Sequence, residues 1–190
     1  MVKISLVIPV HNMANKDFFL QRCLDSIEKQ TFKDYEIVIV EEGKFGENVN
    51  AGIRKAKGDL IKFLCMDDWL ADEESLQRIV DTFKDGWLIS GCSDNPHPFW
   101  TDNIWTGNNK LGSPSCLMIK NENKEPIYFD ETLQWMVDTD FYMKLYKRYG
   151  QPTILDEVNV GIGIHPGQMT HQIPDDVKIK ELLIMKERYN

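Results

Sequence analysis

The sequence predicts an α/β fold in which helices flank a mixed, mainly parallel central sheet. Apolar, β-branched runs of strand length alternate with segments whose apolar residues recur every three or four positions, as they do on one face of a helix. Three of these runs end abruptly in polar or acidic pairs, which is typical of strands whose carboxyl ends meet at a ligand site. We expect these strands at residues 4–10, 35–40 and 60–66, followed by a fourth at 87–92.

Helices should connect these strands. Residues 18–29 place their apolar side chains on one face, so the first strand, this helix and the second strand form a βαβ unit with a right-handed crossover. A second helix should end near Gly58, which we expect to act as its C-cap. A third should occupy residues 73–84, with Asp72 as its N-cap.

The chain changes character after residue 93. Residues 94–112 are rich in Pro, Asn, Asp and Gly, and a loop of this length in a compact domain is usually functional or mobile. We then expect a strand, a helix, a second strand, a Gly/His-rich segment and a closing helix, at residues 115–120, 135–149, 153–160, 161–172 and 175–188. The 190 residues fit a single domain, 1–190.

Composition argues against several classes of function. The formal net charge is −8 and no long basic run occurs, so we expect no nucleic-acid partner. The four cysteines are widely spaced and form no CxxC pair, which argues against a zinc site and gives no sign of a disulfide framework. The sequence contains no recognisable signal peptide or membrane span. We therefore expect a cytoplasmic protein, and leave open peripheral attachment at a membrane surface and the oligomeric state.

The ends of three successive strands carry the candidate chemistry. They are His11-Asn12, Glu41-Glu42 and Asp67-Asp68, and in one parallel sheet they would share an edge. Carboxylates alone repel an anion, but a hard divalent cation can bridge carboxylate oxygens to phosphate oxygens. Neither a Walker-type GxxxxGKS nor a GxGxxG motif occurs. The pattern therefore predicts a nucleoside diphosphate held through Mg²⁺ or Mn²⁺.

Six stretches within residues 1–172 carry a family resemblance: SLVIPVHN, CLDSIEKQT, YEIVIVEEG, NAGIRKAKG, FLCMDDWL and VDTDFYMKL. In order and spacing they resemble family 2 glycosyltransferases of the GT-A fold, although the segment between Gly43 and Asn50 is shorter than is usual there. The resemblance implies a GT-A, Rossmann-like fold with a nucleotide-sugar-binding half, 1–93, and an acceptor-binding and catalytic half, 94–190. It also implies metal-dependent, inverting transfer of a hexose, glucose favoured, from a UDP-sugar to a hydroxyl of an unidentified carbohydrate or glycoconjugate acceptor.

The resemblance further implies roles for single residues. Asp138 matches the general base, and the dipole of the helix that begins near it would keep it ionised. Asp67 matches the metal ligand of an Asp-x-Asp motif in which Cys65 replaces the first acid, and Asp68 and His165 are the other candidate ligands of Mn²⁺ or Mg²⁺. The candidate nucleotide-binding residues are Pro9, Val10, His11, Asn12, Glu41, Glu42, Lys44, Asn50, Met66 and Asp67, and the weaker acceptor candidates are Trp100, Trp105 and His171.

Several alternatives stay open at the level of the sequence. A non-catalytic sugar-nucleotide-binding module agrees with Cys65 and with the shortened segment. A nucleotidyltransferase is less favoured, because no Gly-rich basic loop follows the first strand. Glu41 and Glu42 could simply cap a turn, and His165 could be a loop histidine without a ligand. A favourable charge in the first helical turn is the better account of Asp140.

Overall fold

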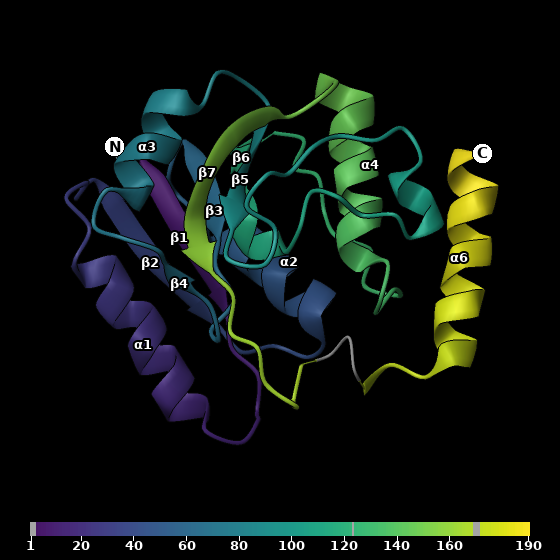
Figure 1. Cartoon of the computed structure of the whole chain (residues 1–190), viewed down its shortest axis with the longest axis horizontal. Helices are drawn as coiled ribbons and strands as arrows, with labels where there is room; N and C mark the ends of the chain where they lie inside the picture. The colour runs from purple at the N-terminus through teal and green to yellow at the C-terminus, as the bar shows by residue number, and fades with distance from the viewer. Residues whose placement is uncertain (1–2, 123, 169–171) are drawn as a thin grey trace.

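The computed structural model describes residues 3–122, 124–168 and 172–190. In these residues one seven-stranded sheet has the order β2-β1-β3-β6-β5-β7-β4 (Figure 1). Its strands are β1 (Ile4–Pro9), β2 (Tyr35–Val40), β3 (Leu60–Phe63), β4 (Trp69–Leu70), β5 (Trp87–Cys92), β6 (Leu117–Lys120) and β7 (Thr153–Gly161). Only β6 and β4 pair antiparallel to their neighbours, so the other five strands share one direction. The expected α/β fold with a mixed, mainly parallel sheet is confirmed.

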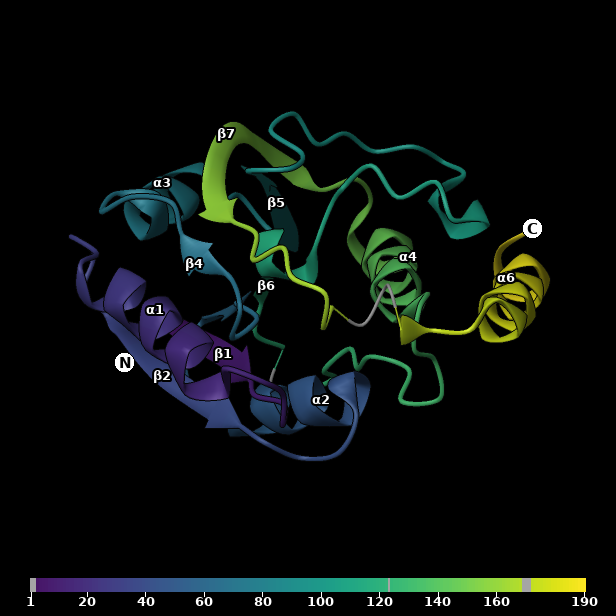
Figure 2. The same cartoon turned by 60° about the horizontal axis from the view of Figure 1, so that its bottom comes forward.

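Helices cover both faces of the sheet. The described helices are α1 (Lys16–Glu28), α2 (Phe45–Lys55), α3 (Ser75–Thr82), α4 (Val137–Tyr149) and α6 (Asp175–Tyr189), with short 3₁₀ turns η1 (Ile104–Thr106) and η2 (Pro114–Cys116). Because β2 and β3 flank β1 on opposite sides, right-handed crossovers put α1 and α2 on opposite faces. In both Figure 1 and Figure 2, α4 lies between the sheet and α6. None of the described helices combines the length and apolar character needed to cross a bilayer.

Two expected helix caps were wrong, and in both cases tertiary contacts explain why. The C-cap of α2 is Ala56, whereas Gly58 packs against the backbone of β1, where a Cβ atom would lie 2.7 Å from the nitrogen of Ser5. Because Gly58 has no side chain, its backbone can lie close to the backbone of β1. The N-cap of α3 is Glu74, because Asp72 Oδ1 accepts the Glu74 N–H at 2.9 Å and so caps the turn before the helix.

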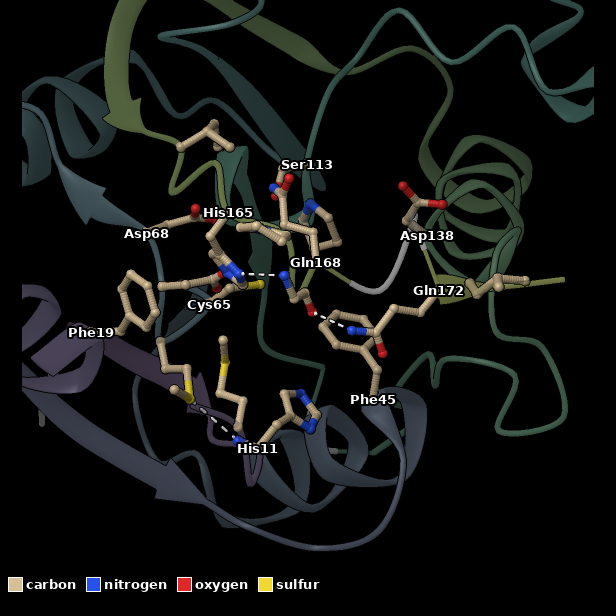
Figure 3. Close-up of a pocket in the computed structure, with 18 of the residues that line it drawn as sticks. His11, Phe19, Phe45, Cys65, Asp68, Ser113, Asp138, His165, Gln168 and Gln172 are labelled. Atoms are coloured by element: carbon tan, nitrogen blue, oxygen red, sulfur yellow. Dashed lines mark hydrogen bonds and ion pairs between the residues drawn. The ribbon is translucent and has the colours of Figure 1, made fainter. Parts of the chain in front are cut away.

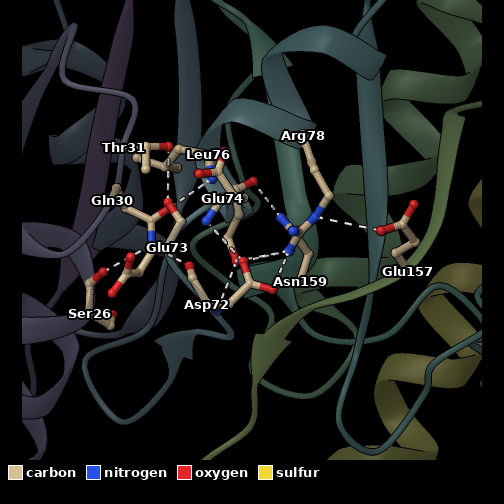
Figure 4. A network of polar contacts seen from close by, with 11 residues as sticks. Ser26, Gln30, Thr31, Asp72, Glu73, Glu74, Leu76, Arg78, Glu157 and Asn159 are labelled. Atoms are coloured by element: carbon tan, nitrogen blue, oxygen red, sulfur yellow. Dashed lines mark hydrogen bonds and ion pairs between the residues drawn. The ribbon is translucent and has the colours of Figure 1, made fainter.

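A polar network joins the end of α1 to α3 and β7 (Figure 4). The buried Gln30 donates to the carbonyl of Asp72 at 2.6 Å and accepts the Leu76 N–H at 2.9 Å. Arg78 on α3 binds both carboxylate oxygens of Asp72 at 2.8 Å, and its Nε donates to Asn159 of β7 at 3.0 Å. These contacts fix the chain on the C-terminal side of β4, and therefore help to fix the short acidic segment that precedes β4.

The strand order creates a crevice at the carboxyl ends of β1 and β3. These two strands are parallel neighbours, with Val7 opposite Phe63. The helix that leaves β1, α1, and the helix that leads into β3, α2, lie on opposite faces of the sheet. Such a switch point is where open α/β sheets bind ligands. The residues that follow β1 and β3 are therefore the ones expected to meet a ligand.

Candidate functional site

A cavity of about 940 Å³ opens beyond the carboxyl ends of β1 and β3 (Figure 3). Its walls come from parts of the chain that are far apart in sequence. They include residues 11–15 after β1, 65–68 after β3, the end of the 94–112 loop, the start of α4 and the segment after β7. A volume of this size falls in the range of small-molecule and cofactor sites.

An acidic cluster forms one wall of this cavity. One ligand atom from each of Cys65, Asp67 and Asp68 lies within 4.8 Å of the others. Oδ2 of Asp67 is also 2.9 Å from Nε2 of His165, a residue 98 positions away in the chain. Of the three residues that the sequence suggested as metal ligands, Asp67 therefore lies near both of the others, Asp68 within the cluster and His165 by direct contact, while the mutually close group contains Cys65 in place of His165.

The backbone of Asp67 is held tightly from two sides. Nη2 of Arg22 on α1 donates to the Asp67 carbonyl, and the same guanidinium stacks 4.0 Å above the ring of Trp69. Gly163 lies against this carbonyl, because a Cβ atom there would be 2.0 Å from the oxygen. Phe19, one turn before Arg22, packs its ring 4.9 Å from the ring of His165. The sequence indicated no role for Arg22 or Gly163.

Replacing Gly163 by alanine should therefore displace the acidic cluster. The added methyl group overlaps a backbone oxygen that Arg22 also holds, so the clash cannot be relieved by a side-chain rotation. We expect Gly163→Ala to lower the free energy of unfolding by ~1–3 kcal/mol, as overpacking typically does. Denaturant unfolding monitored by fluorescence measures this change, and a stability equal to that of the unmodified protein would show that the loop shifts freely.

Asp68 is more deeply placed than Asp67. Its side chain is 3% exposed and Oδ1 accepts the N–H of Gly163 at 2.9 Å. Burial, helped by the nearby charge of Asp67, raises the pKa of Asp68 to about 7. The side chain of Asp67 is 22% exposed, so Asp67 is the more accessible ligand of the two.

A buried cation lies behind the acidic cluster. Lys62 on β3 is fully buried and its Nζ donates to the carbonyl of Ser115, whose hydroxyl accepts the Cys65 N–H at 2.8 Å. Burial lowers the pKa of Lys62 to about 8. Sequence reasoning treated Lys62 only as a break in an apolar run. A single lysine inside an otherwise buried strand is the signal that could have identified it.

Asp138 lies across the cavity from His165 and Asp68, in the first turn of α4 (Figure 3). Oδ1 accepts the Thr139 N–H at 2.7 Å, and Nδ2 of Asn109 lies 3.3 Å from Oδ2. Protein surrounds the carboxylate, although part of the residue stays accessible from the cavity. Burial raises the pKa of Asp138 to about 6, while these hydrogen bonds oppose the shift.

Three of the candidate nucleotide-binding residues besides Asp67 line the cavity: His11, Asn12 and Met66. The His11 N–H donates to Sδ of Met66 at 3.3 Å, and the imidazole stacks on Phe45 with ring centroids 6.3 Å apart. Burial lowers the pKa of His11. Phe45 begins α2 and was not singled out in the sequence, although its ring lies where a planar group could stack.

The other candidate nucleotide-binding residues do not line the cavity. Glu41 pairs with Lys16, Glu42 pairs with Lys55 at 2.7 Å, and Lys44 is the N-cap of α2. Asn50 is buried and hydrogen-bonds the backbone of Phe129 and the side chain of Glu131. Pro9 and Val10 are buried at the end of β1.

Two of the acceptor candidates, Trp100 and Trp105, are also separate from the cavity lining. Trp100 stacks on Tyr146 at 4.4 Å and Trp105 packs against the core. His171 lies outside the described residues. The 94–112 loop does reach the cavity, through Asp94 near its start and Asn109 near its end.

Comparisons with known proteins agree with this fold. No family model matches the chain. The glycosyltransferase GlyA of Streptococcus pneumoniae is 31% identical over a match that covers 43% of this chain and 16% of GlyA. TarS of S. aureus, in complex with UDP-GlcNAc, superposes with a TM-score of 0.70 and 18% identity, covering 96% of this chain and 66% of TarS residues 1–349. The mannosyltransferase PcManGT of Pyrobaculum calidifontis, in complex with GDP-Man and Mn²⁺, gives a TM-score of 0.69 and 13% identity, covering 98% of this chain and 63% of PcManGT.

The chain matches only 16% to 33% of the length of three curated relatives, all of which are named glycosyltransferases. The likeness to TarS and PcManGT extends over nearly all of the chain and concerns the fold. The chain therefore has the GT-A fold and is related in sequence to glycosyltransferases.

Proposed function

We propose that this chain is a metal-dependent, inverting glycosyltransferase that moves a hexose from a nucleoside-diphosphate sugar to the hydroxyl of a carbohydrate or glycoconjugate. UDP-sugars are the first donors to test, with UDP-glucose ahead of the others. The observation that carries the proposal is that Asp67 and His165 lie on one side of a single cavity and Asp138 lies on the other. Support also comes from the sugar nucleotides bound by TarS and PcManGT, which share the fold.

The donor atoms of Asp67 and His165 fit a divalent cation. A carboxylate oxygen and an imidazole nitrogen are both common ligands of such ions, and these two already lie 2.9 Å apart. We assign Mn²⁺ or Mg²⁺ to this position, with Asp68 behind it, and PcManGT was solved with Mn²⁺. A bound ion would offset the negative charge that develops on the leaving diphosphate. Arg22 and Gly163 would keep the Asp67 carboxylate in place through its backbone.

Asp138 would serve as the general base. The bond from C1 of the sugar to the diphosphate oxygen breaks, the acceptor oxygen bonds to C1 from the opposite face, and the acceptor proton passes to the Asp138 carboxylate. Proton transfer to a positioned base contributes roughly 10²–10⁴-fold to the rate. A single displacement inverts the configuration at C1, so an α-linked donor gives a β-linked product.

This assignment divides the proposed work between the two halves of the chain. Residues 1–93 would supply most of the donor site, including His11, Asn12, Met66 and Asp67. Residues 94–190 would supply Asp138 and the acceptor side, with His165 reaching across to the donor site. The 94–112 loop would contact the acceptor through Asp94 and Asn109.

A donor screen tests the proposal. UDP-glucose, UDP-galactose, UDP-N-acetylglucosamine and GDP-mannose are incubated with a panel of glycoside acceptors, with and without Mn²⁺, and release of UDP or GDP is measured. We expect metal-dependent release that acceptors increase, together with a β-linked product from an α-linked donor. Metal-dependent nucleotide binding without turnover on the whole panel would favour the non-catalytic binding module, with which Cys65 in place of an acid agrees.

The pH dependence of transfer follows from Asp138. Its pKa is raised from 3.8 to about 6, and a base must be ionised, so activity is lost as the pH falls through about 6. We expect kcat at saturating Mn²⁺ to rise tenfold per pH unit below pH 6 and to level above it. Asn109→Ala removes a hydrogen bond that favours the charged form of Asp138, so the fall in kcat on the acidic side should begin at a higher pH. A kcat that becomes independent of pH already above about pH 4 in the unmodified protein would contradict this role for Asp138.

A further inference from the structure

Glu181 on α6 is a buried carboxylate that binds three consecutive backbone N–H groups. Its side chain is 3% exposed. Oε1 accepts the N–H of Gln134, and Oε2 accepts the N–H groups of Trp135 and Met136, each at 2.8 Å. These residues form the turn that immediately precedes α4, which begins at Val137. We call residues 134–136 the entry turn.

The electrostatics of this contact explain how a buried charge is tolerated. The N–H groups at and before a helix start have no partners within the helix, and the dipole makes this end positive. A carboxylate that accepts three such N–H groups forms charge-assisted hydrogen bonds, which are stronger than neutral ones. Among the described residues no lysine, arginine or histidine is paired with Glu181, so the entry turn supplies its compensation.

The entry turn is part of the cavity wall. Gln134 and Trp135 line the cavity, as does Asp138, which follows the entry turn by two residues. The position of this turn therefore sets where α4 begins and which way its first-turn side chains face. A shift of the turn would carry Asp138 with it.

The end of α6 also binds Asp140, two residues after Asp138 in the first turn of α4. Nη1 of Arg188 lies 2.7 Å from Oδ2 of Asp130 and 2.9 Å from Oδ1 of Asp140, and the Tyr189 hydroxyl donates to Asp140 at 2.8 Å. Asp140 is fully buried. Contacts from α6 therefore fix the chain on both sides of Asp138, at residues 134–136 before it and at Asp140 after it. α6 itself lies on the outside of α4 (Figure 2).

We propose that Glu181 is a positioning residue for transfer: by fixing the entry turn, it keeps the Asp138 carboxylate directed into the cavity. Glu181 acts through the backbone and does not touch the reactants. The inference rests on the proposed role of Asp138 as the base. It assigns to the C-terminal helix a part in the chemistry, whereas the described contacts that hold Asp67 and His165 come from Arg22, Gly163 and Phe19.

The test compares Glu181→Gln with Glu181→Asp and with Leu182→Ala. The glutamine is isosteric, but its amide group offers one oxygen and turns an NH₂ toward N–H donors, so the entry turn loses at least one hydrogen bond. The aspartate keeps the charge. Leu182 is the adjacent residue on α6 and packs partly on the core, so its truncation loosens the helix and leaves the carboxylate intact.

We expect Glu181→Gln to lower kcat roughly 10–100-fold while the KM for the sugar nucleotide stays within threefold. Glu181→Asp should recover part of kcat, and Leu182→Ala should lower the thermal midpoint without lowering the kcat of the folded protein. A purely structural role predicts that kcat follows the thermal midpoint in all three variants. An unchanged kcat in folded Glu181→Gln, or a loss confined to KM, overturns the proposal.

Hydrogen exchange gives a second readout that does not depend on activity. Amides 134–136 should exchange at least tenfold faster in Glu181→Gln than in the unmodified protein, and unchanged protection would show that Glu181 does not hold the entry turn. If hydrogen exchange shows that Glu181 holds the entry turn but the unmodified protein transfers no sugar from any donor, the proposed function fails and the role of Glu181 in transfer fails with it. If the unmodified protein transfers sugar and the Glu181 variants transfer it equally fast, the positioning role alone is wrong.

Discussion

Asp67→Asn is expected to abolish metal-dependent nucleotide binding. The substitution keeps the shape of the side chain and removes the charge that faces His165 across 2.9 Å, so the proposed ion loses its most available carboxylate. We expect the affinity for UDP in the presence of Mn²⁺ to fall at least ~100-fold, which corresponds to about 2.7 kcal/mol. Isothermal titration calorimetry with UDP and with GDP, each with and without Mn²⁺, measures this change.

Asp94→Asn is the matched control for this experiment. Asp94 also lines the cavity, but it lies outside the cluster formed by Cys65, Asp67 and Asp68. The control removes the same charge from the same cavity, so it should change the nucleotide affinity by less than about threefold, an electrostatic effect of about 0.6 kcal/mol. Equal losses of nucleotide affinity in the two variants would show that binding depends on the net charge of the cavity. Full retention of affinity in Asp67→Asn would show that the metal ion binds elsewhere.

Asp138→Asn should retain donor binding and lose transfer. The asparagine cannot accept the acceptor proton, so kcat should fall by roughly 10²–10⁴-fold, the contribution typical of a positioned base. The KM for the sugar nucleotide should change little, because Asp138 lies across the cavity from His165 and Asp68. Steady-state kinetics with the best donor and acceptor from the screen provide both numbers.

A distant acid serves as the control for Asp138→Asn. Asp156 is exposed and pairs with His97 on the surface, so Asp156→Asn should leave both kcat and KM unchanged. If Asp138→Asn transfers sugar as fast as this control, Asp138 is not the base. A loss that appears only in the KM for the donor would assign Asp138 to nucleotide binding.

The strands were predictable because their signals are local. The runs at Tyr35–Val40 and Trp87–Cys92 match the expected bounds, since an apolar, β-branched stretch of that length is sufficient to identify a strand. β4 was missed because it consists of Trp69 and Leu70 alone, and it exists only through pairing with Gly161 and Val160. A two-residue strand made by a partner ninety residues away leaves no pattern in its own sequence.

The acidic residues of the candidate site could be predicted from the sequence, but the residues that hold them in place could not. Asp67 follows a strand that the pattern identifies, and strand ends on one side of a parallel sheet meet at one edge. Arg22 carries no comparable signal, because an arginine on a helix surface is usually solvated. Its contact with the Asp67 carbonyl depends on how α1 packs, which the sequence does not specify locally.

Asp140 and Glu181 show the same limit at the C-terminal helix. Asp140 was interpreted as a favourable charge at a helix start, but it is fully buried and paired with Arg188, 48 residues later. Glu181 lies on one helix face with Val177 and Met185, four residues from each, and the buried Met185 marks the inner face. A carboxylate on the inner face of a helix is a signal that could have indicated a buried partner.

Anomalous X-ray diffraction from a crystal grown with MnCl₂ and UDP tests the central claim most directly. The account predicts one strong manganese peak bonded to a carboxylate oxygen of Asp67, with the diphosphate of UDP on the cavity side of the ion and Asp138 facing the space beyond it. A manganese ion bound away from Asp67, or UDP bound in this cavity without any ion, would contradict the account.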